Sequence, residues 1–275
     1  SMYTEYQPSH LLVPYIDNYW EFKGNPEYGM RIHILPDGCT DFIFTLGEVA
    51  NAVEEGSLIM QPYRSYFVGP MTKYSELVTY TESIHMFGVR FLPCGLSCFT
   101  NLPLHEFVNS RVSTNEMKAV FDDTFIEKLG EQKHVTDRIR VVEEYLLAYL
   151  ARHYQPADSH VAMAVNMINH SKGKRSVRSL MDDVCLCQRH FERKFKHYTG
   201  FTPKEYSRIV KFKNAVELLR TTTSANLLTT AVDAGYYDLA HFSKEIKSMS
   251  GNTPASFLSL TVPEETTLTY IEPQR

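Results

Sequence analysis

The sequence has no apolar run long enough to cross a membrane and no stretch with the pattern of a secretory signal. A spanning helix needs roughly 18–20 consecutive apolar residues, whereas the hydrophobic 43% of these 275 residues is divided among shorter runs. Cysteine is also scarce, and the five thiols lack the spacing of a disulfide framework. We therefore expect a cytoplasmic protein with no membrane association that can bury a core of its own.

Motifs of enzyme active sites are missing as well. The sequence contains no phosphate-binding glycine loop, no HExxH zinc motif and no Ser-His-Asp order. Potential metal ligands occur in the first hundred residues, but they include no His-x-His pair, and a thiolate zinc site needs four ligands. These candidates are His33, Cys39, His85, Cys94 and Cys98. We predict no enzyme activity, no metal and no cofactor.

Charge is divided unevenly along the chain. Residues 157–260 carry 15 Lys and Arg against 9 Asp and Glu, a net +6. Residues 1–156 carry 12 against 20, a net −8, and the tail 261–275 has a net −2. A basic segment joined to an acidic one indicates that the basic part meets a polyanion, although the asymmetry could also be incidental.

Residues 1–135 predict a β-rich domain. Short runs rich in aromatic and β-branched residues end at Gly or Pro turns, which is typical of a sandwich or small barrel. In the turn Pro36-Asp37-Gly38, proline restricts φ, Asp bonds its own backbone and glycine supplies a positive φ. The predicted strands cover residues 18–24, 30–38, 40–47, 64–70 and 85–93.

The hydrophobic period changes at residues 136–153, where Ile139, Val142, Leu146 and Tyr149 recur every three or four positions. This pattern predicts an amphipathic helix. The helix could pack on its own barrel or on a second subunit. With the linker at 154–159 it forms a connecting segment over residues 136–159.

Residues 160–260 contain an internal repeat with an offset of 51. Residues 188–206 and 239–257 share six identities in nineteen positions, among them Gly200 with Gly251 and Pro203 with Pro254. Each copy predicts a short helix, a tight turn and a second helix that stops at the glycine. A capping box then begins the next helix in the first copy. The fold class is therefore α+β multidomain, with an all-α domain of two helix-turn-helix units and an acidic tail at 261–275.

The second helix of a helix-turn-helix unit can enter the DNA major groove and contact base edges. Arginine binds guanine, glutamate accepts from cytosine, small apolar groups contact the thymine methyl and lysine suits phosphate. The long helix predicted from residue 202 to 220 spans roughly 27 Å, near the roughly 34 Å between successive major grooves. The predicted DNA-binding residues are Arg189, Glu192, Arg193 and Lys196 in the first unit and Leu239, Ala240, Ser243, Lys244 and Lys247 in the second.

Residues 160–258 resemble the DNA-binding domain of the AraC/XylS family of bacterial transcription regulators, most closely in the stretch AGYYDLAHFSKEIKSMSGNTPASF (234–257). The resemblance implies double-stranded promoter DNA and RNA polymerase as partners. It also implies base contacts by Arg189, Glu192 and Arg193, and by Ala240, Ser243 and Lys244. The sequence departs from the family at Cys187, where Ser or Thr usually caps the second helix of the first unit. A thiol is a poor helix cap.

The stretches LPDGCTDFIF (35–44) and GVRFLPCG (88–95) resemble a cupin-like domain found on a subgroup of these regulators. The resemblance implies a barrel that binds a small effector and helps the protein to form a homodimer. Arg31, His33 and Arg90 are polar residues in otherwise apolar strands, so they could bind the effector or lie at the surface.

We therefore predict a one-component, effector-controlled transcription regulator. One alternative is a regulator whose N-terminal domain only dimerises or binds a protein partner, and a more distant one is a DNA-repair enzyme of the Ada type. Cys185 and Cys187 are expected to be partly buried structural thiols, with a redox switch as the other interpretation.

Arg193→Ala should weaken specific DNA binding by roughly 1–3 kcal/mol and relax the preference at one base position. Lys247→Ala provides the comparison, because a lost phosphate contact weakens binding equally across sequences and reduces the salt dependence. Binding titrations on variant sites test both. An unchanged footprint for Arg193→Ala, or an altered sequence preference for Lys247→Ala, would contradict the assigned roles.

Overall fold

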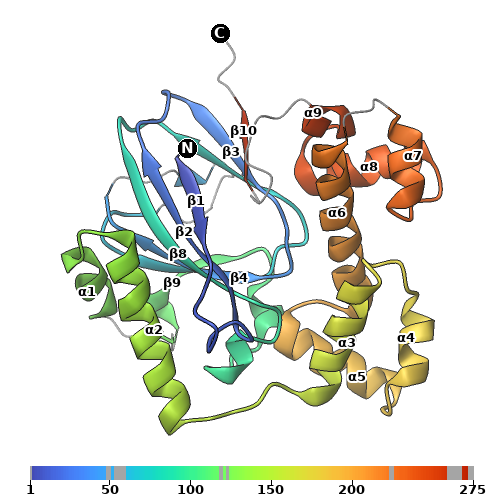
Figure 1. The fold of residues 1–275 in the computed structure, drawn as a ribbon, viewed down its shortest axis with the longest axis horizontal. Coiled ribbons are helices and arrows are strands. Elements are labelled where there is room, and N and C mark those ends of the chain that lie inside the picture. Colours follow the sequence, from blue (N-terminus) through green and yellow to red (C-terminus); the bar gives the residue numbers. More distant parts are fainter. Residues whose placement is uncertain are drawn as a thin grey trace.

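A computed structural model describes residues 2–47, 51–52, 60–117, 120–121, 124–222, 226–258 and 268–271. A β-rich domain and a helical domain lie side by side, and strand β10 returns from the end of the chain to the β-rich domain (Figure 1). The predicted α+β fold, with two helix-turn-helix units at the C-terminal side, is confirmed.

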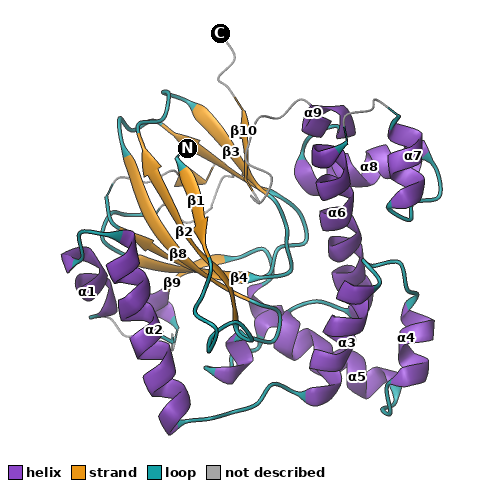
Figure 2. Ribbon diagram, viewed as in Figure 1, coloured by secondary structure: helices purple, strands orange, loops and turns teal. Residues whose placement is uncertain are grey.

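Two antiparallel sheets form the β-rich domain (Figure 2). One has six strands in the order β1-β2-β8-β4-β6-β9 and the other has four in the order β10-β3-β7-β5. The strands are β1 (Tyr3–Tyr6), β2 (Ile16–Gly24), β3 (Met30–Ile34), β4 (Thr40–Thr45), β5 (Asn51–Ala52), β6 (Ser65–Val68), β7 (Ser75–Thr79), β8 (Ile84–Phe91), β9 (Arg111–Ser113) and β10 (Leu268–Ile271).

Both faces of the six-stranded sheet are buried, which explains why its strands are apolar almost throughout. On the inner face, Trp20 and Met86 pack against Ile32 and other residues of the smaller sheet. On the outer face, a phenylalanine-rich layer that includes Phe42 packs against Leu146 of helix α2 (Val135–Arg152). Helix α2 therefore covers its own sheet, and α1 (Phe125–Glu131) lies beside it.

Strand β10 lies in the segment that we interpreted only as an acidic tail. It pairs antiparallel with β3, with Leu268 opposite Ile34 and Ile271 opposite Arg31. Four residues give little local signal for a strand, so the pairing depends on the open edge of β3 and could not be predicted from the run itself.

The helical domain follows the predicted order closely. Gly200 and Gly251 end the second helix of each unit with φ of 84° and 75°. The capping box at α6 is complete, because Thr202 Oγ1 accepts from Glu205 N at 3.1 Å and Glu205 Oε1 accepts from Thr202 N at 2.9 Å. The helices are α3 (Ser159–His170), α4 (Val177–Asp183), α5 (Gln188–Thr199), α6 (Pro203–Thr221), α7 (Leu227–Asp233), α8 (Leu239–Ser250) and α9 (Pro254–Leu258).

Candidate DNA-binding face and inter-sheet cavity

Helices α5 and α8, here called the reading helices, each bury one apolar side and expose the other. On α5, Phe191 and Phe195 are fully buried, and Glu192 Oε1 accepts a hydrogen bond from Gln188 Nε2 at 3.2 Å. The guanidinium of Arg193 lies 3.0 Å from the ring of His190. The remaining polar face of α5 is open to solvent at Arg189, Arg193 and Lys196, with Glu192 half-buried.

Helix α8 has a side-chain N-cap, whereas α5 has none. Asp238 accepts a hydrogen bond from His241 N at 2.7 Å, whereas Cys187 makes no side-chain bond at the start of α5. Lys247 Nζ donates to the Gly251 carbonyl at 2.9 Å, which holds its ammonium at the C-terminal end of α8. The outward positions of α8 are Leu239, Ala240, Lys244 and Lys247, all exposed, and Ser243, half-buried.

The two cysteines of the first turn differ from expectation. Cys185 and Cys187 are both free and exposed, so the prediction of partly buried thiols is wrong. Val184, which is buried, and Leu186 supply the apolar contacts of this turn to the helical core instead. Successive residues of an extended segment point to opposite sides, so Cys185 and Cys187 face solvent while Val184 and Leu186 face the core.

The β-rich domain contacts the C-terminal ends of both reading helices. At Gly200, a Cβ would overlap the ring of Pro70. At Gly251, a Cβ would lie 2.8 Å from Tyr74 Cζ and 2.9 Å from His33 Cε1. These glycines therefore serve two purposes, since each ends its helix in the left-handed conformation and each allows the other domain to approach.

Hydrogen bonds join the domains at α8. Tyr74 N donates to the Met249 carbonyl at 2.9 Å, and His33 Nδ1 lies 3.0 Å from the Ser250 carbonyl oxygen. Because a carbonyl oxygen only accepts, Nδ1 carries a proton in this contact. The other ring nitrogen of His33 lies 2.6 Å from Glu76 Oε2. His33 is thus a contact between the domains.

The three residues predicted to bind an effector do not come together. Arg31 is exposed and lies 3.6 Å from Glu76 Oε1, and His33 meets α8. Both side chains belong to the face of β3 opposite Ile32, so they point away from the space between the sheets. Arg90 alone of the three lines that space.

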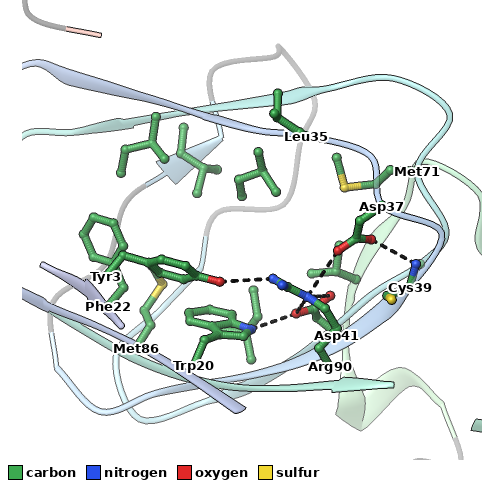
Figure 3. A pocket seen from close by; sticks show the side chains of 16 residues that line it. Tyr3, Trp20, Phe22, Leu35, Asp37, Cys39, Asp41, Met71, Met86 and Arg90 are labelled. Carbon is green, nitrogen blue, oxygen red and sulfur yellow. Dashed lines mark hydrogen bonds and ion pairs between the residues drawn. The ribbon is translucent and has the colours of Figure 1, made fainter. Parts of the chain in front are cut away.

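A narrow cavity lies between the two sheets (Figure 3). Its walls are apolar, with the aromatic rings and Met86 on the six-stranded sheet and aliphatic side chains from both sheets. Polar groups gather at one end, which we call the polar end and which consists of Asp37, Cys39, Asp41 and Arg90. The walls include Trp20, Phe22, Ile32, Leu77 and Met86.

Arg90 is the centre of the polar end and is almost fully buried. Its Nε lies 3.2 Å from Asp41 Oδ2 and 3.3 Å from Asp37 Oδ2, and its Nη1 lies 3.5 Å from Glu5 Oε1. Its Nη2 donates to the Tyr3 hydroxyl at 3.3 Å. The guanidinium is therefore surrounded by acidic partners.

Burial acts strongly on the carboxyl groups of Asp41 and Glu5. It raises the pKa of Asp41 to about 6, although the charge of Arg90 lowers it. Burial likewise raises the pKa of Glu5 and of the neighbouring Asp17. If the positive charge of Arg90 fully offset the burial of these carboxylates, their pKa values would be lowered. The raised pKa values therefore show that Arg90 does not offset it.

The wall of the cavity also touches the helical domain. Leu35 belongs to the core of the helical domain, and a Cβ at Gly38 would lie 2.7 Å from Tyr206 Cε2 on α6. The Tyr206 hydroxyl in turn donates to Asn169 Oδ1 of α3 at 2.7 Å. Residues 35–38 thus form a direct contact between the cavity and α6.

Sequence reasoning missed Asp41, Tyr206 and the role of the Asp37 turn. Asp41 is a polar residue in an apolar strand, which is the criterion that selected Arg90, and the two are directly paired across β4 and β8. That criterion, applied to the stretch 40–47, could have found it. Tyr206 gave no such signal, because it reads as one of the apolar positions of a helix.

Within the part of the chain that the structure describes, no three His, Cys, Asp or Glu side chains gather as a metal site. In the same residues, no helix is both long and apolar enough to span a bilayer.

Comparison with known proteins separates the two domains. Residues 180–259 match the family model described as a helix-turn-helix domain, and residues 4–113 match a domain of unknown function, DUF6597. The specific resemblance of the N-terminal stretches to cupin-like domains is not confirmed. No curated protein matches the chain.

Two solved structures share the fold. ToxT from Vibrio cholerae has 10% identity and a TM-score of 0.52, over 87% of this chain and 97% of its own. Wild-type ToxT from the same organism with an unsaturated fatty acid bound has 10% identity and a TM-score of 0.50, over 87% and 94%.

Two helix-turn-helix units on one long helix, with the model match over the same residues, define a DNA-binding transcription regulator. More particularly, residues 180–259 form a helix-turn-helix domain.

Gly251→Ala should destabilise the protein and loosen the contact of α8 with the β-rich domain. The residue has a positive φ, which costs roughly 1 kcal/mol for alanine, and its new Cβ would meet Tyr74 and His33. Gly130→Ala is the matched control, because nothing lies within 4 Å of a Cβ there. Thermal melting compares them, and equal melting temperatures for the two variants would contradict the contact.

Proposed function

We propose that this protein is a one-component regulator whose reading helices bind successive major grooves of promoter DNA and whose inter-sheet cavity binds a small effector. The observation that carries the proposal is the contact between residues 35–38, which wall the cavity, and Tyr206 on α6, which joins the reading helices. Its five free thiols suit the cytoplasm.

On the DNA side, the proposed roles follow from side-chain chemistry and exposure. Arg189 and Arg193 would donate to guanine and Glu192 would accept from cytosine, while Lys196 would contact phosphate. On α8, Leu239 and Ala240 would contact thymine methyl groups, and Ser243 and Lys244 would bond base edges or phosphate. Lys247, held at the end of its helix, would meet the backbone.

On the effector side, contacts between the two domains among the described residues include those at Gly200, at Gly251 and between residues 35–38 and Tyr206. A ligand that binds the cavity better in one arrangement of these contacts shifts the population of arrangements. The structure of ToxT with a bound unsaturated fatty acid supports the idea that this fold accommodates small ligands. We also propose that the protein contacts a second copy of its own chain and RNA polymerase.

Selection of bound sequences from random DNA, followed by footprinting, tests the DNA-binding part. The full chain should protect two major-groove segments about 10–10.5 base pairs apart on one face, and inserting about half a helical turn between them should abolish high affinity. Lys128→Ala, which changes an exposed charge on α1, should leave the footprint unchanged. A single protected segment, or binding without sequence preference, would contradict two reading helices.

The effector part has a separate test. A bound ligand should raise the melting temperature of the full chain and change its affinity for the selected site. A N-terminal domain that only dimerises or binds a protein partner would instead show stability that depends on protein concentration or on that partner.

A further inference from the structure

The polar end of the inter-sheet cavity carries an excess of negative charge. We infer that the cavity takes an amphipathic molecule with an apolar body and a positively charged amine head, which is seated against Asp37 and Asp41. The inference rests on the proposed function and names the chemical class of the effector.

Arg90 is the central cation of the polar end, because it lies within 3.5 Å of Glu5, Asp37 and Asp41. Asp17 adds a fourth carboxylate, and Lys213 and Arg111 add two cations that interact with Asp37 and Asp41 respectively. When all are ionised, four carboxylates face three cations, which leaves an excess of one negative charge. The side chains of Glu5, Asp37 and Asp41 are only 11%, 12% and 14% exposed. Water therefore solvates this excess poorly, and a further cation at the polar end would be strongly favoured.

The protonation of these groups agrees with the count. Burial raises the pKa of Asp41 to about 6 and raises the pKa of Glu5, which shows that the ionised forms lack sufficient compensation. A bound ammonium would favour the ionised forms, whereas a bound carboxylate would add to the repulsion. The polar end therefore selects against an anionic head.

The walls of the cavity indicate the chemistry of the ligand's apolar body. Trp20, Phe22 and Tyr3 present aromatic rings, and Met86 supplies an adaptable thioether. Trp20 is held in place because its Nε1 donates to Asp41 Oδ2 at 2.7 Å. Aromatic faces beside a carboxylate suit an ammonium carried on an apolar group, since ring faces also attract cations.

Lys213 on α6 connects this site with the helical domain. Burial would lower the pKa of Lys213, but the acidic groups of Cys39, Asp37 and Asp17 raise it overall. Its side chain keeps solvent access even though both domains surround it, so the attraction is partly screened. An ammonium in the cavity would compete with Lys213 for Asp37 and so weaken the attraction between α6 and the β-rich domain.

Three probes with one body test the head group: 4-phenylbutylamine, 4-phenylbutanol and 4-phenylbutyrate. Calorimetry on the full chain near pH 7.5, where the amine is charged, should show the amine binding at least about tenfold more tightly than either other probe. Asp37→Asn and Asp41→Asn should each remove most of this preference. Asparagine keeps the acceptor oxygens for Cys39 N and Trp20 Nε1, so both variants should remain folded, as melting curves will report.

Glu27→Gln is the matched control, because it removes an exposed carboxylate from the same acidic domain and should leave the preference intact. Amine affinity should also fall as the pH drops through about 6, because Asp41 then gains a proton and loses its charge. Tighter binding of the carboxylate, or equal binding of all three probes, would overturn the amine inference and leave the proposed effector function standing. Binding of none of the three would contradict both.

Discussion

The close approach of the two domains at Gly200 and Gly251 is the constraint on which the arrangement of the reading helices depends. Each glycine ends a reading helix and faces the β-rich domain, with Pro70 at one and Tyr74 with His33 at the other. The β-rich domain contains a sheet that is packed on both faces. It contacts both reading helices at their C-terminal ends. The N-terminal residues of these helices, for which we propose base contacts, are directed away from it.

The contact between the domains also carries an imbalance of charge. The acidic residues around Arg90 lie where the cavity, the turn at residues 35–38 and α6 come together. Some of the acidic residues behind the net charge of −8 of residues 1–156 are thus buried and clustered. Lys213 of the basic domain interacts with this cluster. A site with unbalanced charge at a domain boundary can respond to a small ligand, because neutralising it changes the free energy of both neighbours.

Local signals predicted the helical domain well, because glycine stops, the Thr202 cap and the repeated Phe positions act within one or two turns. Strands β2, β3, β4, β6 and β8 were also predicted from their runs, whereas β1, β5, β7 and β9 were not. What each face of the strands meets was not predicted either. Arg31 and His33 were candidates for effector binding together with Arg90, with the surface as the alternative. They lie on the face of β3 that points away from the cavity, and only strand pairing decides which face that is. Whether α2 packs on its own sheet, and whether residues 268–271 form a strand, likewise depend on distant partners.

The pairing of β10 with β3 has a consequence for how the protein is made. During synthesis the β-rich domain appears first and the helical domain second, but the strand that covers the β3 edge arrives only after both. Until then that edge is open, and an open edge is where a chain can pair wrongly. In chain order, the helical domain therefore lies between two strands of one sheet, β3 and β10. The four-stranded sheet that contacts α8 is completed only after α8 has been synthesised.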